Sequence, residues 1–442
     1  MARELTGGKT KNVLFFFSLP MLGSAAFQQF YNIVDSIIAG KFIGTLGLAA
    51  VGASYPVTAI YTAVALGMNI GCTVVISQFF GGKRIEKMKT AISTAAITFL
   101  SMAMILLIFG LLFCRGLLTL LDTPGSVFQN ASEYLIIYTL GLPFVFLYNM
   151  CTGAFTATGD SGTPFLFLVV SSISNVVLDL LFVCVFHLGV AGLAWATIIC
   201  QMGASVAAAA VLQKRLKKME CEKHPFFSLE MLRKIMKLAV PGILQQSFIS
   251  VGNLLIQRAV NQYSEIVIAG YAAAIKLNSF AVSLGVTMSS AVSAFSAQNI
   301  GAKNYKRVKE GHQWGLIYGY LLVSGFFLAY FFAGNFFMGL FVKGSSQGVL
   351  HVGIRFLQIV SPFYFVMVTK VVCDGVLHGS ASVKLFMTTT FVDLILRVVL
   401  AYILPLRFSY TGIWMAWPIG WCISATLSVG FYLSGRWKKS RI

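Results

Sequence analysis

The sequence predicts an all-α polytopic membrane protein with twelve transmembrane helices in two six-helix lobes related by a parallel internal repeat. The first observation is composition, since 57% of the residues are hydrophobic and only 11% are charged. Soluble domains average about 45–50% apolar and about 25% charged residues, so a soluble globule is excluded. The second observation is that the apolar runs are long and continuous, which favours helices over alternating β-barrel strands. The third is an internal repeat.

The expected spans follow from the apolar runs. At about 20 residues per crossing plus short loops, 442 residues have room for about twelve spans. We expect them at residues 13–38, 46–78, 91–113, 132–156, 163–186, 190–213, 236–260, 266–297, 313–338, 350–377, 384–404 and 411–434.

The two halves of the chain share landmarks at a nearly constant offset. The recurring residues are Gln78, Gly81, Lys83 and Lys89, which return 220 positions later as Gln298, Gly301, Lys303 and Lys309. The expected parts are an N-terminal six-helix lobe over 1–213, a cytoplasmic linker over 214–235 and a C-terminal six-helix lobe over 236–442. An even number of spans in each half gives parallel repeats. We expect the last part of the polar stretch 213–237 to form an amphipathic helix on the membrane surface.

The net charge of +19 is sorted by loop rather than gathered on one face. Basic residues concentrate at both ends of the chain and in every second loop, which by the positive-inside rule places both termini in the cytoplasm. The surplus is therefore a topology signal and not a nucleic-acid surface. We expect a multi-pass protein of the cell membrane, of the bacterial inner-membrane type, that contacts membrane lipids and acts as a monomer.

Two carboxylates in the first half are the principal candidates for an ion site. Asp35 falls inside an apolar run where an ionised carboxylate costs ~2.5–3.5 kcal/mol, and such residues are normally kept for function. Asn175 and Asp179 are four apart and share one helix face. With Thr197 in the following span, they offer hard oxygen ligands for Na⁺, or a site shared with a proton. The alternative is that these groups only hydrogen-bond between helices.

The first span carries further polar residues and a proline. Gln28, Tyr31 and Asn32 give it a polar stripe, which makes them candidates for lining a substrate cavity. Pro20 removes a backbone hydrogen bond, so we expect a bend. Membrane helices also tolerate proline with no functional consequence, and the sequence leaves both interpretations open.

The second half holds secondary candidates. Asp374 and Asp393 lie inside spans, and Asp393 is four residues before Arg397, which predicts an ion pair within one helix. No phosphate loop, metal-ligand spacing or nucleophile–base set stands out. We therefore expect no enzyme and no cofactor, with Na⁺ or H⁺ as the only coupling ion.

Four motifs together with the six-plus-six repeat resemble the multidrug and toxic compound extrusion (MATE) family. They are VDS at 34–36, SQFFGGK at 77–83, TGDSGTP at 158–164 and NVVLD at 175–179, and the resemblance covers nearly the whole chain. It implies two lobes around a central cavity and export driven by a sodium or proton gradient.

The resemblance is to the DinF-like branch in particular. It implies a cation site in the first lobe at Asp35, Asn175, Asp179 and Thr197, with Asn149 and Gln28 beside it. The NorM branch is known for a second site that uses a Glu in the seventh helix and an Asp in the tenth. Asp374 resembles that Asp, but the seventh span has no carboxylate in QQSFISVGNLLIQ at 245–257.

Two functions remain as alternatives. The first is a secondary antiporter that exports amphipathic, cationic small molecules by alternating access. The second is a flippase for a lipid-linked saccharide or another lipid, as relatives of the same superfamily are. Cations in or near the spans of the second half, at Arg258, Lys276, Lys370 and Arg397, suit the flippase. The carboxylates of the first half suit cation antiport.

Overall fold

The computed structural model describes residues 4–221, 224–340 and 347–439, and within these ranges the chain is helical, with no strand. The helices of the first half are α1 (Thr10–Ile38), α2 (Gly44–Gly81), α3 (Ile85–Leu120), α4 (Gly125–Leu140), α5 (Leu142–Ala157), α6 (Gly162–Leu180) and α7 (Gly189–Lys218). Two short π-helices, η1 (Ala39–Ile43) and η2 (Leu181–Val185), continue α1 and α6.

The second half repeats this order of long helices. They are α8 (Leu229–Val260), α9 (Glu265–Gly301), α10 (Tyr305–Phe332), α11 (Gly334–Gly339), α12 (Gln347–Val360), α13 (Tyr364–Gly379), α14 (Val383–Ile403), α15 (Pro405–Phe408) and α16 (Tyr410–Leu433). Short 3₁₀ segments, η3 (Ser361–Phe363) and η4 (Arg436–Lys438), follow α12 and α16.

The predicted helical membrane fold is confirmed. Ten helical stretches of the described chain are long and apolar enough to cross a membrane, and the bent pair of α4 and α5 adds an eleventh. One of the ten, Thr10–Gly81, is 72 residues long and contains both α1 and α2. A single crossing needs only about 20 residues, so this stretch supplies two, and the twelve expected spans each have a counterpart.

Prolines explain where two of the spans are interrupted. The axes of α4 and α5 differ by 48° at Gly141, with Pro143 at the start of α5. In the second half, Pro362 lies in the 3₁₀ segment that separates α12 from α13. Proline lacks the N–H that an α-helix interior requires, so the chain restarts its helix there.

The second part of the stretch 213–237 is helical, as predicted, and it is continuous with the following span. Helix α7 continues to Lys218, and the stretch from Leu229 onward is the first part of α8, without a break before the membrane span. The basic and apolar residues that suggested an amphipathic surface helix are the exposed and packed sides of these first turns.

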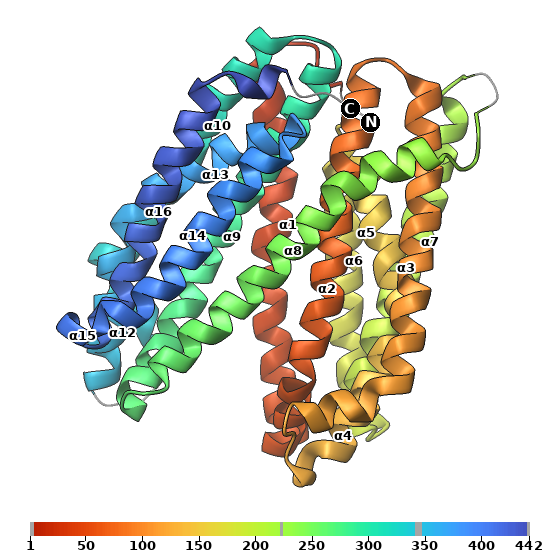
Figure 1. The fold of residues 1–442 in the computed structure, drawn as a ribbon. Helices are drawn as coiled ribbons and strands as arrows, with labels where there is room; N and C mark the ends of the chain where they lie inside the picture. The colour runs from red at the N-terminus through yellow and green to blue at the C-terminus, as the bar shows by residue number, and fades with distance from the viewer. Residues whose placement is uncertain (1–3, 222–223, 341–346, 440–442) are drawn as a thin grey trace. The chain divides into compact units, whose positions relative to one another are not determined.

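The chain forms two compact units, each a bundle of long helices lying side by side (Figure 1). The first contains Gly23–Gln246, and the second contains Leu5–Leu22 together with the chain from Ser247 onward. Helices α1 and α8 therefore each begin in one unit and end in the other. Pro20 lies two residues before the point where α1 changes units.

Small residues let the helices of each unit approach closely. In the first unit, a Cβ built on Gly67 of α2 would lie 2.3 Å from the backbone nitrogen of Ile243 in α8. In the second, a Cβ on Gly379 of α13 would lie 2.3 Å from the carbonyl oxygen of Ser293 in α9. In lipid the hydrophobic effect does not drive helices together, so close packing of the helix backbones at small residues contributes to their association.

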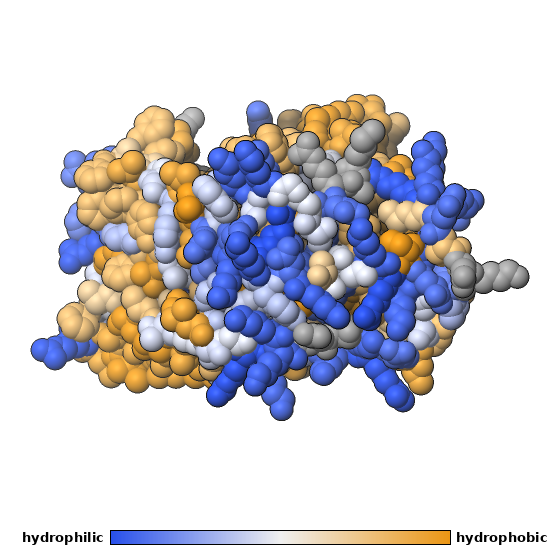
Figure 2. Space-filling model, turned by 90° about the horizontal axis from the view of Figure 1, so that it is seen from above, coloured by the Kyte–Doolittle hydropathy of each residue, from blue (hydrophilic) through white to orange (hydrophobic). Residues whose placement is uncertain are grey.

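The surface has the polarity of a membrane protein. Figure 2 shows one end face, on which hydrophilic residues gather while hydrophobic residues surround them. Large apolar side chains are exposed along the spans, for example Leu112 at 73% and Phe332 at 72%. A soluble protein would bury such surface, so lipid is its natural solvent.

Candidate ion site

The candidate site of the first unit lies where two helices change their winding. Asp35 is in the last turn of α1, directly before the π-helix η1, and Asp179 is in the last turn of α6, directly before η2. A π-helix widens the backbone ladder and is frequent near functional sites. Both carboxylates therefore lie where an α-helix changes into a π-helix.

Hydrogen bonds join these helices around the two acids. The carboxyl groups of Asp35 and Asp179 interact directly with each other. The Asn175 amide, oriented so that both of its ends are satisfied, donates to Asp179 Oδ2 at 3.1 Å and accepts from the Thr197 backbone N–H at 3.1 Å. It also contacts the Tyr31 hydroxyl. Asn175 and Asp179 thus lie on the same face of α6, and their role in binding a cation stays a prediction.

Asp179 is buried, Asp35 is half-buried, and neither has a basic partner in the described chain. Asp179 is fully buried and its Oδ1 has no hydrogen-bond partner among the described residues. No lysine, arginine or histidine of the described chain forms an ion pair with either acid. Two carboxyl groups in contact cannot both be ionised without strong repulsion, so the site requires a proton or another cation.

An apolar cluster covers one side of the site. Ile38, Val183 and Leu193 pack together. Each lies about one helical turn from a polar residue of the site: Ile38 from Asp35, Val183 from Asp179 and Leu193 from Thr197. Because α7 runs back along α6, Leu193 lies on the same side.

Three other predicted site residues have hydrogen-bond partners of their own in the described chain. Gln28 donates to Asn32 on the exposed side of α1. The Asn149 amide donates to the carbonyl of Val145 in its own helix α5, and in the described chain no hydrogen bond joins it to the carboxylates. The Thr197 hydroxyl donates within α7 to Leu193, so only its backbone N–H meets Asn175.

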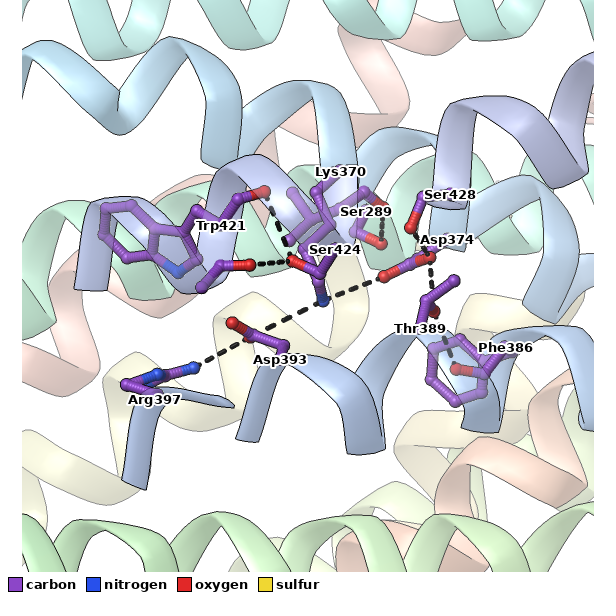
Figure 3. A network of polar contacts seen from close by, with 12 residues as sticks. Ser289, Lys370, Asp374, Phe386, Thr389, Asp393, Arg397, Trp421, Ser424 and Ser428 are labelled. Carbon is purple, nitrogen blue, oxygen red and sulfur yellow. Dashed lines mark hydrogen bonds and ion pairs between the residues drawn. The ribbon is translucent and has the colours of Figure 1, made fainter. Parts of the chain in front are cut away.

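A second buried charge cluster occupies α13, α14 and α16 of the second unit (Figure 3). The Arg397 guanidinium donates to Asp393 at 2.8 Å, which confirms the predicted ion pair within α14. On α13, the Lys370 ammonium donates to Asp374 at 3.0 Å and lies 3.9 Å from Asp393. Lys370 therefore links the carboxylates of the two helices.

Sequence reasoning missed what surrounds Asp374. Its Oδ1 accepts hydrogen bonds from the hydroxyls of Thr389, at 3.0 Å, and Ser428, at 2.7 Å. The spacing of Lys370 and Asp374, four residues apart as in the pair of α14, could have revealed the ion pair. The contacts from α14 and α16 have no sequence signal, because they depend on how three helices pack.

Long apolar helices gathered in two compact units, with a pair of acids among the helices of the first unit, are typical of a membrane transporter. A family model named MatE matches residues 20–181 and 241–403. The chain belongs to this MATE family, as its motifs suggested.

Relatives and solved structures agree with this assignment. "Probable multidrug resistance protein YoeA" of Bacillus subtilis (strain 168) is 26% identical, over 96% of this chain and 94% of that protein. "Probable multidrug resistance protein YpnP" of the same strain is 27% identical, over 100% and 99%. The solved structure of an outward-facing multidrug resistance MATE transporter of the MOP superfamily superposes with a TM-score of 0.93, at 21% identity over 99% of both chains. This last likeness is one of fold.

Proposed function

We propose that the protein is a secondary active multidrug antiporter of the DinF-like branch. It exports amphipathic, cationic small molecules in exchange for H⁺ or Na⁺ by alternating access. The observation that carries the proposal is the pair formed by the half-buried Asp35 and the fully buried Asp179, which has no basic partner in the described chain. The names of YoeA and YpnP, which denote probable multidrug resistance proteins, support export of drugs.

The chemistry of the pair explains how an ion gradient could drive export. A proton shared between the two carboxyls, or a Na⁺ between them, removes their repulsion and favours the arrangement in which α1 and α6 are joined. Loss of the ion restores the repulsion and disfavours that arrangement. An ion that binds two states with different affinity shifts their equilibrium, which is the requirement for coupling.

Asn175 and Tyr31 act as positioning residues in this scheme. The Asn175 amide bridges Asp179 and the backbone of α7, so it fixes one carboxyl relative to the third helix of the site. Asp35 comes from the part of α1 that belongs to the first unit, whereas the start of α1 belongs to the second. A change in the site is thereby passed along one helix to the other unit.

The charge distribution favours antiport over a lipid flippase. Recognition of a lipid pyrophosphate calls for unpaired cations, yet Lys370 and Arg397 are paired with buried carboxylates. Of the four basic residues that suit a flippase, two are therefore already neutralised by carboxylates within the second unit. We further propose two six-helix lobes acting as a monomer in the cell membrane, with both termini cytoplasmic.

The test is gradient-driven efflux of a fluorescent cation, ethidium, from proteoliposomes with imposed pH or Na⁺ gradients. Asp35→Asn and Asp179→Asn should insert normally and lose export, because the charge that an ion offsets is gone. Asp122→Asn is the matched control, since Asp122 is an exposed carboxylate in the turn after α3 and should keep full export. Full export by both buried-site variants, with loss only in Asp374→Asn, would move the coupling site to the second unit.

A further inference from the structure

We propose that Lys370 is a tethered cation: its ammonium group permanently occupies the carboxylate site of the second unit, which therefore takes up no ion from solution. Only the first unit exchanges ions. The inference builds on the proposed function, since it assigns the two units different roles in coupling.

The geometry around Lys370 is that of a bound cation. Its Nζ lies 3.0 Å from Asp374 Oδ2 and 3.9 Å from Asp393 Oδ2, between side chains of α13 and α14, as Figure 3 shows. Only 8% of the Lys370 side chain is exposed, so the ammonium has little water to interact with. An ammonium offers three N–H donors to surrounding oxygens, which is the role a small cation plays among carboxylates.

The cluster is balanced in charge. Two carboxylates, Asp374 and Asp393, face two basic groups, Lys370 and Arg397, and all four residues are at least nine-tenths buried. The other oxygen of Asp374 is already satisfied by Thr389 and Ser428. A cation from solution would have to displace Lys370, which would leave the ammonium buried without a partner.

The first unit lacks any equivalent of this arrangement. At the 220-residue offset of the internal repeat, Lys370 and Asp374 correspond to Met150 and Ala154, whereas Asp179 corresponds to Val399. The two charged sites are therefore not copies of one ancestral site. One is a pair of acids without a base, and the other is a neutral network of acids and bases.

The first experiment measures how many cations bind to each purified protein molecule. Sodium binding is measured with radioactive Na⁺, and proton binding is measured from the pH change of a weakly buffered solution. Its background is Asp35→Asn/Asp179→Asn, which removes the acids of the first unit. We expect no saturable uptake in this background. Saturable uptake that disappears when Asp374→Asn is added would overturn the proposal, because the second unit would then take up a cation despite Lys370.

The second experiment removes the tether in the same background. Lys370→Met should gain one saturable cation per protein, and Lys370→Met/Asp374→Asn should lose it again. Lys370→Arg, which keeps the charge, should gain none. A folded Lys370→Met protein with no gain overturns the proposal. A second outcome would also overturn it. If Lys370→Met cannot be purified as folded protein at any Na⁺ concentration or pH, whereas Lys370→Met/Asp374→Asn can, then the carboxylate of Asp374 binds no cation from solution once Lys370 is removed.

Failure of the proposed function would look different. If Asp35 and Asp179 did not couple transport, their variants would export normally. Lys370→Met would still gain a bound cation, and Lys370→Met/Asp374→Asn would still lose it.

Discussion

At the scale of single residues, Asp160 shows how one carboxylate can hold a helix end in place. It lies in the turn before α6, where its Oδ1 accepts from the backbone N–H groups of Gly162 and Thr163 at 3.1 and 3.0 Å. The guanidinium of Arg215, from α7, forms an ion pair with it. Burial raises the pKa of Asp160, but the hydrogen bonds from Thr163 and the ion pair outweigh this effect, so its pKa is lowered.

The stability supplied by Asp160 should depend on pH in one direction. A lowered pKa in the folded state means that the unfolded state binds a proton more readily, so the contribution is complete above the unfolded value of about 3.9. It is lost as the pH falls through the lowered value of the folded state. We expect Asp160→Asn to reduce the free energy of unfolding by about 1–3 kcal/mol at pH 7. The difference from the wild type should shrink below about pH 4.

Thermal unfolding in detergent at pH 7 and pH 3 would measure this difference. The control is Glu230→Gln, which breaks the exposed ion pair of Glu230 with Lys234 and should change nothing measurable. An equal loss of stability by Asp160→Asn at both pH values would show that its charge is unimportant.

At the scale of elements, α1 combines Pro20, a change of unit and the carboxylate of Asp35 within one helix. Replacing Pro20 with Ala restores a backbone donor and should straighten or stiffen the helix near Leu22. We expect folded protein with slower ethidium efflux, measured in proteoliposomes as above. Pro56→Ala is the matched control, because Pro56 lies inside α2, which stays in one unit. Normal efflux by Pro20→Ala would reduce this proline to a tolerated irregularity.

The close approach of α2 and α8 gives a second prediction at this scale. Gly67→Ala places a methyl group against the backbone of Ile243, and overpacking of this kind typically costs about 1–3 kcal/mol. Gly52→Ala in the same helix meets nothing within 4 Å and should leave stability unchanged or slightly raised. The melting temperatures of the two purified variants decide the matter. Similar values would mean that the helices separate without cost.

The sequence predicted elements well where apolar length alone decides. The span expected at 163–186 matches α6 with η2, for example, because a hydrocarbon-length run has few other structures available in lipid. After residue 213 it predicted a helix but not that this helix continues into the next span, because the same amphipathic pattern suits a surface helix and the start of a long one. It also could not predict that Lys370 reaches Asp393, because that contact depends on the packing of α13 against α14.

At the scale of the whole molecule, the orientation in the membrane is testable by labelling. The exposed basic residues Lys83, Arg84 and Lys87 follow α2, so the positive-inside rule places this turn in the cytoplasm. With the exposed Cys184 and Cys221 replaced by serine, Gly125→Cys should react with an impermeant maleimide on intact cells. Gly82→Cys should react only after permeabilisation. The opposite pattern would reverse the orientation.

The beginning of α1 belongs to the second unit, and this has a consequence for biosynthesis. Leu5 is fully buried, and its backbone N–H donates to Gln298, which is 293 positions further along the chain. A ribosome adding about 5–20 residues per second needs roughly 15–60 s to make that partner. During this delay the beginning of the nascent chain has no docking site, so a ribosome stalled before α9 leaves an unfinished protein whose first helix a quality-control protease can recognise.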